Sequence, residues 1–269
     1  MIDSKVFNEL MNRGIITQVG LNPENYKDIA DLQRHGLATS IGAVEVYEDA
    51  MSELINKEEV LAKFLADVAA GGTVVVPMDL ELTAPITIEK DVTIDLNGYT
   101  LSNTPWLEDG ETNAYMFWAK AGKLTINGEG TISVPDAIYS MAVWANGGDV
   151  EINGGTYMNG GDSCDLIYAS KKGNIVINNG TFKAAGPSSG TVSGTKNPYS
   201  ALNIKDANKV TCSISVKGGK FYMFDPANNL SENPKMNFCA EGYESVADGD
   251  WFVVSKAEDK DIVVDDNKE

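Results

Sequence analysis

The sequence predicts an all-β fold: a single-stranded, right-handed parallel β-helix of about five coils, with an N-terminal helical cap and a small, mostly helical N-terminal module. The first observation is a degenerate repeat in which an alternating apolar strand runs into an Asn/Gly turn and then into a second short strand. The second is its period, because Ile126 to Ile152 is a step of 26 residues and Ile152 to Ile177 a step of 25. The repeat occurs at residues 92–101, 124–132, 150–157, 175–182 and 214–221.

Each repeat is expected to contain strands, because its apolar residues alternate and turn-forming residues follow them. Val150 and Ile152 share one face of a strand and are expected to point into the core, while Glu151 points outward. Asn and Gly adopt left-handed backbone geometry readily, so the chain turns there without closing a hairpin. Successive repeats then pair in parallel and enclose a continuous apolar core.

A second series of apolar segments precedes the repeats and keeps the same step. Trp118 to Trp144 spans 26 residues, and Trp144 to Tyr168 spans 24. Two strand series in step predict at least two strands in each coil, stacked at the usual strand separation of about 4.8 Å. The series comprises residues 114–119, 140–145, 165–170 and 200–205.

Two intervals between repeats are longer than the others and contain residues that break strands. The insertions lie at residues 102–113 and 185–198, and both are rich in turn-forming residues. Insertions in a solenoid leave the coil at its turns, and loops of this kind carry variable recognition. We therefore expect any contact with a ligand to involve these two loops.

The segments before and after the repeats predict a three-part organisation. Residues 1–56 are expected to form an attachment and oligomerisation module of short helices, including one at residues 44–56. Residues 57–256 are expected to form the β-helix, capped at its start by an amphipathic helix from Lys57 to Gly71. A hairpin around Asp248 and Gly249 is expected to close its other end, and residues 257–269 form an acidic tail.

Composition excludes several classes of function. The formal charge of −18 at pH 7 works against binding to nucleic acid, which requires a basic face. No window is apolar enough for a bilayer span, and the N-terminus lacks the pattern of a signal peptide, so we expect no membrane partner. Cys164, Cys212 and Cys239 show no metal-ligand or disulfide spacing and are expected to be free thiols. We expect no metal site and no cofactor.

The aromatic series Trp118, Trp144 and Tyr168 is the candidate binding site. Two interpretations stay open: an internal aromatic ladder, which we favour because such ladders bury much apolar area, and an exposed platform on which sugar rings stack. A second series, Tyr157, Phe182 and Phe221, is expected to lie in the core. The asparagines at the turns, Asn127, Asn153 and Asn178, are expected to form a hydrogen-bonded ladder with a structural role.

Catalytic residues are not evident in the β-helical segment. From Lys57 onward the sequence contains no Arg and no His. Its carboxylates are scattered along the coils instead of paired, whereas glycoside hydrolysis requires two carboxylates across one groove. We therefore expect no catalytic residues and no enzymatic activity. A polysaccharide-degrading β-helix enzyme, a depolymerase or lyase, remains the main alternative, and a bacterial surface adhesin is a further one.

From the helix and the glycines at 71–72 through the Asn/Gly repeats, the chain resembles the pectate-lyase-like superfamily of right-handed β-helices. That superfamily includes lyases, hydrolases and non-catalytic fibres, so the resemblance indicates the fold and leaves the function open. With motifs such as residues 95–101 and 241–254, the chain also resembles the head-fibre proteins of tailed phages of gut Bacteroidetes, including crAss-like phages.

The resemblance to head fibres implies a structural virion protein that decorates the capsid as a homotrimer. Decoration of the tail is the second option. It implies that residues 1–56 bind the phage capsid protein, and that the β-helix points outward and contacts host surface glycans through the two insertions. Localisation would then be the virion, assembled in the cytoplasm of the host bacterium. These are expectations from the resemblance.

Overall fold

The computed structural model describes residues 42–108, 110–160, 165–186, 191–192, 195–196, 200–229 and 235–257, with side chains from Asn56 onward apart from Glu108 and residues 191–196. The chain divides into two units, Met1–Lys63 and Phe64–Glu269, and each is described by itself. The predicted attachment module falls on residues of which only the helical part from Gly42 is described.

The N-terminal described element is a single helix, α3 (Gly42–Ala70). The sequence predicted two helices that meet near residue 56, and the structure joins them because no Gly or Pro interrupts residues 43–70. The helix ends at Gly71, which has φ +87° and donates its N–H to the carbonyl oxygens of Asp67 and Val68. Phe64 and Val68 in the last turns are buried.

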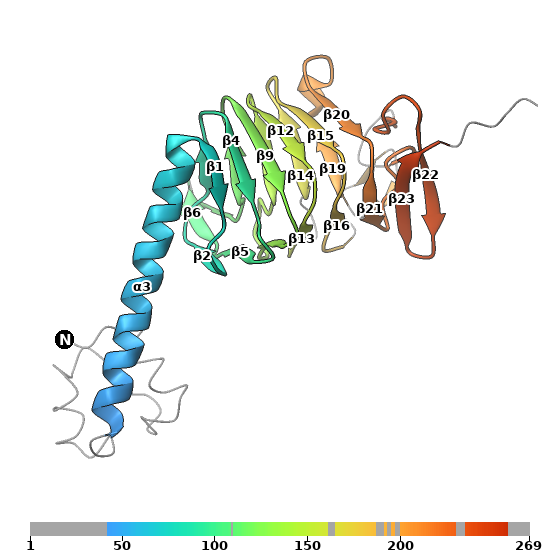
Figure 1. Ribbon diagram of the computed structural model, residues 1–269. Helices are drawn as coiled ribbons and strands as arrows, with labels where there is room; N and C mark the ends of the chain where they lie inside the picture. Colours follow the sequence, from blue (N-terminus) through green and yellow to red (C-terminus); the bar gives the residue numbers. More distant parts are fainter. Residues whose placement is uncertain are drawn as a thin grey trace, which may run out of the picture. The chain divides into compact units, whose positions relative to one another are not determined.

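The strands that follow α3 form three large sheets in which parallel pairing predominates. Strands of the first sheet lie side by side in a regular order (Figure 1). They are β1 (Gly72–Val75), β4 (Val92–Asp95), β9 (Lys123–Asn127), β12 (Asp149–Ile152), β15 (Asn174–Ile177) and β20 (Ser213–Val216).

The second and third sheets repeat this arrangement with the strands that follow. The second contains β2 (Leu80–Leu82), β5 (Thr100–Asn103), β10 (Thr131–Val134), β13 (Thr156–Asn159), β16 (Thr181–Lys183) and β21 (Gly219–Tyr222). The third contains β3 (Ile86–Ile88), β8 (Phe117–Ala119), β11 (Val143–Asn146), β14 (Ile167–Ser170) and β19 (Leu202–Ile204). The chain therefore visits the first, second and third sheets in rotation.

Pairing between neighbouring strands follows the period of the sequence. Ile126 pairs with Ile152 and Ile152 pairs with Ile177, so each strand lies beside its counterpart one repeat away. Trp144 pairs with Trp118 on one side and with Tyr168 on the other. The prediction of a mostly β chain with parallel sheets is confirmed.

Alternation along the strands fills the space between the sheets with apolar side chains. Val150 and Ile152 are buried, and Glu151 between them lies on the outer side, as the sequence predicts. The rings of Tyr157, Phe182 and Phe221 stack in the interior at centroid separations of 5.0 and 4.7 Å, with 10° between neighbouring planes. All three are fully buried, so the prediction that this series lies in the core is confirmed.

Both insertions contain antiparallel pairs outside the three parallel sheets. The first holds β6 (Trp106–Glu108) and β7 (Glu111–Asn113), and the second holds β17 (Thr191–Val192) and β18 (Thr195–Lys196). At the C-terminal end, β22 (Tyr243–Asp248) and β23 (Trp251–Lys256) form the predicted hairpin, which adds to β21 in antiparallel orientation. The predicted acidic tail lies outside the described residues apart from Ala257.

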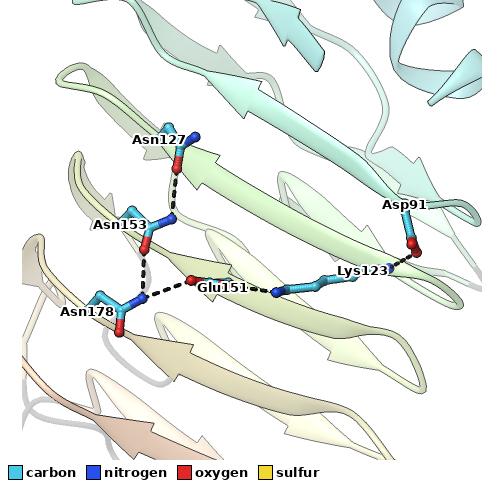
Figure 2. A network of polar contacts seen from close by, with 6 residues as sticks. All are labelled: Asp91, Lys123, Asn127, Glu151, Asn153 and Asn178. Atoms are coloured by element: carbon cyan, nitrogen blue, oxygen red, sulfur yellow. Dashed lines mark hydrogen bonds and ion pairs between the residues drawn. The ribbon is translucent and has the colours of Figure 1, made fainter. Parts of the chain in front are cut away.

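Side chains of the turn asparagines form a chain of hydrogen bonds between repeats (Figure 2). Asn153 donates to Oδ1 of Asn127 at 2.8 Å, and Asn178 donates to Oδ1 of Asn153 at 2.7 Å. Asn178 also donates to Oε1 of Glu151, whose other carboxylate oxygen pairs with Lys123. The predicted asparagine ladder is confirmed, and it stabilises the turns that separate the first sheet from the second.

The ion pair in this network predicts a pH dependence of stability. The hydrogen bond from Lys123 holds the pKa of Glu151 below its ordinary value of 4.5. A carboxyl with a lowered pKa stabilises the folded state above its ordinary pKa, and this contribution disappears as the pH falls through the lowered value. Replacing Glu151 with Gln removes it. We expect the difference in unfolding free energy between wild type and Glu151→Gln, measured by urea denaturation, to shrink as the pH is lowered below 4.5.

The control for this measurement is Glu129→Gln, which removes an exposed carboxylate from a neighbouring turn. Its effect on unfolding free energy should stay small across the same pH range. A Glu151→Gln effect that does not change with pH would contradict the assignment of the ion pair.

Candidate functional site

Three aromatic residues of the third sheet form a row on its outer side. Trp118, Trp144 and Tyr168 are each half-buried and stand between two buried neighbours on strands β8, β11 and β14. The favoured interpretation, an internal aromatic ladder, is therefore wrong. The physical reason is that successive side chains of a strand point to opposite faces. Phe117 and Ala119 occupy the inner side of β8, which places Trp118 on the outer side.

The rings of this row stack on one another. The Trp118 and Trp144 rings lie 5.3 Å apart with 9° between their planes, and Tyr168 follows at 6.4 Å with a tilt of 43°. The buried ring of Tyr115 packs edge-on against both indoles, at 5.6 Å from Trp118 and 5.3 Å from Trp144. Trp106 in the first insertion contacts Tyr115 in the same edge-on manner at 4.9 Å. The insertion thus supports the aromatic row.

A groove of about 620 Å³ runs along the aromatic row. The exposed side chains of Ile138 and Tyr139 contribute to its apolar wall. Its polar lining is supplied by Glu111, Asn113, Asn146, Asp165, Ser170, Lys171, Lys205 and Asn208. Aromatic surface beside amide, hydroxyl and charged groups is the lining that sugar-binding clefts require, because a sugar ring has apolar C–H faces and a hydroxyl rim.

Hydrogen bonds fix several polar side chains of the groove. The indole N–H of Trp144 donates to Oγ of Ser170 at 2.8 Å, and the Ser170 hydroxyl donates to Oδ1 of Asn146 at 2.9 Å. Asp165 accepts hydrogen bonds from the Ser200 hydroxyl and, at 2.8 Å, from the Asn203 amide. These contacts hold the groove in a defined shape before any ligand arrives, which lowers the entropic cost of binding.

The sequence identified three aromatic residues of this site and missed the rest. Tyr115 lies in a predicted strand segment, but nothing in the repeat marks it as a partner of Trp118. Ile138 and Tyr139 precede a predicted strand, and Lys171 and Asn208 come from turns that meet only in the folded chain. Of the two insertions expected to carry recognition, the first contributes Glu111 and Asn113 to the groove.

A larger hollow, of about 870 Å³, follows the turns between the first and second sheets. Glycine and threonine residues supply much of its lining, and no aromatic residue lines it. It therefore offers no surface for ring stacking and few side chains that could select a ligand. The aromatic groove is the better candidate site despite its smaller volume.

The described residues offer few groups suited to catalysis or to metal binding. No group of three His, Cys, Asp or Glu residues in the described part of the chain is placed to hold a metal ion. Cys212 and Cys239 are free thiols, as predicted, while Cys164 lies outside the described residues. Burial raises the pKa of Cys239 to about 11 and also raises that of Cys212, so both remain protonated at neutral pH.

Comparisons with protein-family models, with curated proteins and with solved structures found no match to this chain. Among the helical residues that the structure describes, no stretch is both long and apolar enough to cross a membrane. Function must therefore be argued from the arrangement of the three sheets and from the groove.

Proposed function

We propose that this chain is a structural protein of a tailed phage particle, a head fibre whose parallel β-helix presents a glycan-binding groove to the host surface. The observation that carries the proposal is the aromatic groove on the outer side of a regular stack of parallel strands. A long, repetitive β-structure suits a rigid extension, and the groove supplies a surface for contact with sugars.

Rotation of the chain through three sheets supports a β-helix. In the proposed β-helix, three successive strands of the three sheets make one coil, and the described strands would supply five complete coils followed by β20 and β21. Parallel strands joined by a crossover within one sheet are almost always connected with right-handed geometry, which favours a right-handed coil. The buried Phe64 and Val68 in the last turns of α3 precede β1 directly, which supports a capping role for this part of the helix.

Attachment and assembly are assigned to residues 1–56, which we propose bind the phage capsid protein and form a homotrimer. The sequence of α3 supports self-association. The apolar residues Tyr47, Met51, Leu54 and Leu61 follow steps of four, three and seven, and Glu58 occupies the heptad position between the last two. This heptad spacing is typical of helices that pack against copies of themselves.

Glycan binding is assigned to the groove at Trp118, Trp144 and Tyr168. The ring faces of Trp118 and Trp144 stack on each other, so a sugar would pack against the apolar outer edges of the row, and polar groups around the rings would select the hydroxyl pattern. We expect Trp144→Ala to weaken binding of a bacterial surface oligosaccharide by about tenfold or more, as loss of a central aromatic contact does at other interfaces. Isothermal titration calorimetry measures this change.

The matched control is Trp251→Ala, which removes an indole from the C-terminal hairpin, far along the chain from the groove residues. It should leave the affinity unchanged. Equal affinities for wild type and Trp144→Ala would contradict the assignment of the groove, provided that thermal unfolding shows both variants folded.

A polysaccharide-degrading enzyme is the second candidate, because the groove contains two carboxylates, Glu111 and Asp165. A hydrolase would need one as an acid and the other as a base or nucleophile. Size-exclusion chromatography of the polysaccharide after incubation separates the two functions. The structural proposal predicts an unchanged chain length with wild type, whereas shortening that disappears in Glu111→Gln or Asp165→Asn would establish the enzyme.

A further inference from the structure

Lysine residues gather beside the aromatic groove of this strongly acidic chain. A second hollow of about 550 Å³ adjoins the groove, and Trp118 lines both. Its other lining residues include Lys120, Lys171 and Lys172, and none of its eight lining residues is acidic. We call this hollow the lysine pocket. On a chain with a net charge of −18, three adjacent amines form a local exception to the prevailing charge.

Within the described part of the chain, the amines of the lysine pocket are not neutralised by carboxylates. Among the described residues, no carboxylate forms an ion pair with Lys120, Lys171 or Lys172. Asp206, two residues before the pocket residue Asn208, pairs with Lys209 at 2.7 Å. The positive charge of the pocket therefore remains available to a ligand.

The turn that carries two of the lysines is held in place by side chains. Lys171 has a φ of +58°, a left-handed conformation that residues other than glycine seldom adopt. Its N–H donates to Oδ1 of Asn208 at 2.9 Å, and its carbonyl oxygen accepts the Thr211 hydroxyl at 2.7 Å. Backbone strain of this kind persists where surrounding contacts enforce it and is common at binding sites.

The third amine is placed by an aromatic ring. Nζ of Lys120 lies 3.6 Å from the centroid of the Trp118 ring, a cation–π contact that fixes the ammonium at the boundary between pocket and groove. The indole N–H of Trp118 has no acceptor among the described residues, whereas the N–H of Trp144 donates to Ser170.

Carboxylates of the groove are absent from the lining of the lysine pocket. Glu111 and Asp165 line the groove but not the pocket. Asp165 is engaged by Ser200 and Asn203 on the third sheet and its preceding turn. The groove therefore contains two acids together with Lys171 and Lys205, whereas the charged side chains of the adjoining pocket, which shares Lys171, are all lysines.

From this arrangement we propose that the lysine pocket binds an anionic group of the glycan, a carboxylate or a sulfate ester, while the sugar ring lies in the adjoining groove. The proposal rests on the glycan-binding function and names its ligand class. Hydrogen bonds between ammonium groups and anionic oxygens are about twice as strong as those between neutral partners, so the pocket selects charged over neutral sugars.

Calorimetry with three oligosaccharides of equal length, one bearing uronic acids, one bearing sulfate esters and one neutral, tests the proposal. We expect wild type to bind at least one anionic oligosaccharide about tenfold more tightly than the neutral one. Lys171→Gln with Lys172→Gln should abolish this preference. The control, Lys90→Gln with Lys256→Gln, changes the net charge equally at exposed positions outside the pocket and should retain it. The anionic oligosaccharide that binds more tightly shows whether the pocket prefers a carboxylate or a sulfate ester.

A second measurement, with inorganic sulfate in place of an oligosaccharide, tests the anion site independently of glycan binding. We expect sulfate, compared with chloride at equal ionic strength, to change the tryptophan fluorescence of wild type and not of the pocket variant. Equal affinity for neutral and anionic oligosaccharides, or a preference that survives in the pocket variant, would overturn the anion site and leave glycan binding intact. A fluorescence response to sulfate without binding of any oligosaccharide would support the anion site and contradict the proposed glycan-binding function.

Discussion

Replacing Gly154 with alanine is expected to lower the free energy of unfolding by about 3 kcal/mol. A Cβ at this position would lie 2.6 Å from the carbonyl oxygen of Gly128 in the preceding repeat. The oxygen belongs to the backbone of one turn and the Cβ is fixed by the backbone of the next, so neither can move without disturbing the ladder from Asn127 to Asn153. Urea denaturation of the wild type and the variant measures the difference.

Gly98→Ala is the matched control for this substitution. Gly98 has a φ of +81°, and no atom lies within 4 Å of the point that a Cβ would occupy, so alanine there suffers conformational strain without a collision. We expect a cost of about 1 kcal/mol. At Gly154 φ lies outside the left-handed region, and alanine without a collision would stabilise the protein by restricting the unfolded chain. A stabilised Gly154→Ala would therefore contradict the close approach of the repeats.

Replacing Phe182 with alanine is expected to cost about 4 kcal/mol of unfolding free energy. Phe182 is fully buried and stacks between Tyr157 and Phe221, so its removal leaves a cavity and breaks two ring contacts. The parallel strands on either side fix the positions of its neighbours, which limits their collapse into the cavity. Denaturation in urea again provides the measurement.

The comparison for Phe182 is Trp144→Ala on the outer side of the third sheet. Trp144 is half-buried, so its removal should cost distinctly less stability while it weakens glycan binding. Two aromatic rows are thereby assigned different roles, one structural and one in recognition. Equal losses of stability at both positions would show that the outer row belongs to the core.

Strand pairing could be predicted from the sequence because it depends on a repeated signal. The steps of 26 and 25 residues between Ile126, Ile152 and Ile177 predicted the correct register, and the turn asparagines predicted the ladder. The strands β2 and β3 were missed because each has only three residues and neither is followed by the Asn/Gly turn that marks the repeat. Short strands of this kind are defined by their neighbours in the sheet.

The orientation of Trp118 could not be predicted, because both faces of its strand carry apolar residues. Phe117, Trp118 and Ala119 are all suited to a core, so alternation alone does not identify the inner side. The lysine pocket was also beyond prediction. Lys120 and Lys171 lie in turns of different repeats, and only the stacking of those repeats brings them beside Trp118.

Assembly as a homotrimeric fibre is the part of the proposed function that a single measurement tests most directly. Multi-angle light scattering of the full-length chain should give three times the chain mass of 28.9 kDa, because we propose that copies of the chain pack together through the apolar residues of α3. A mass of 28.9 kDa at all accessible concentrations would contradict trimer formation through the N-terminal residues.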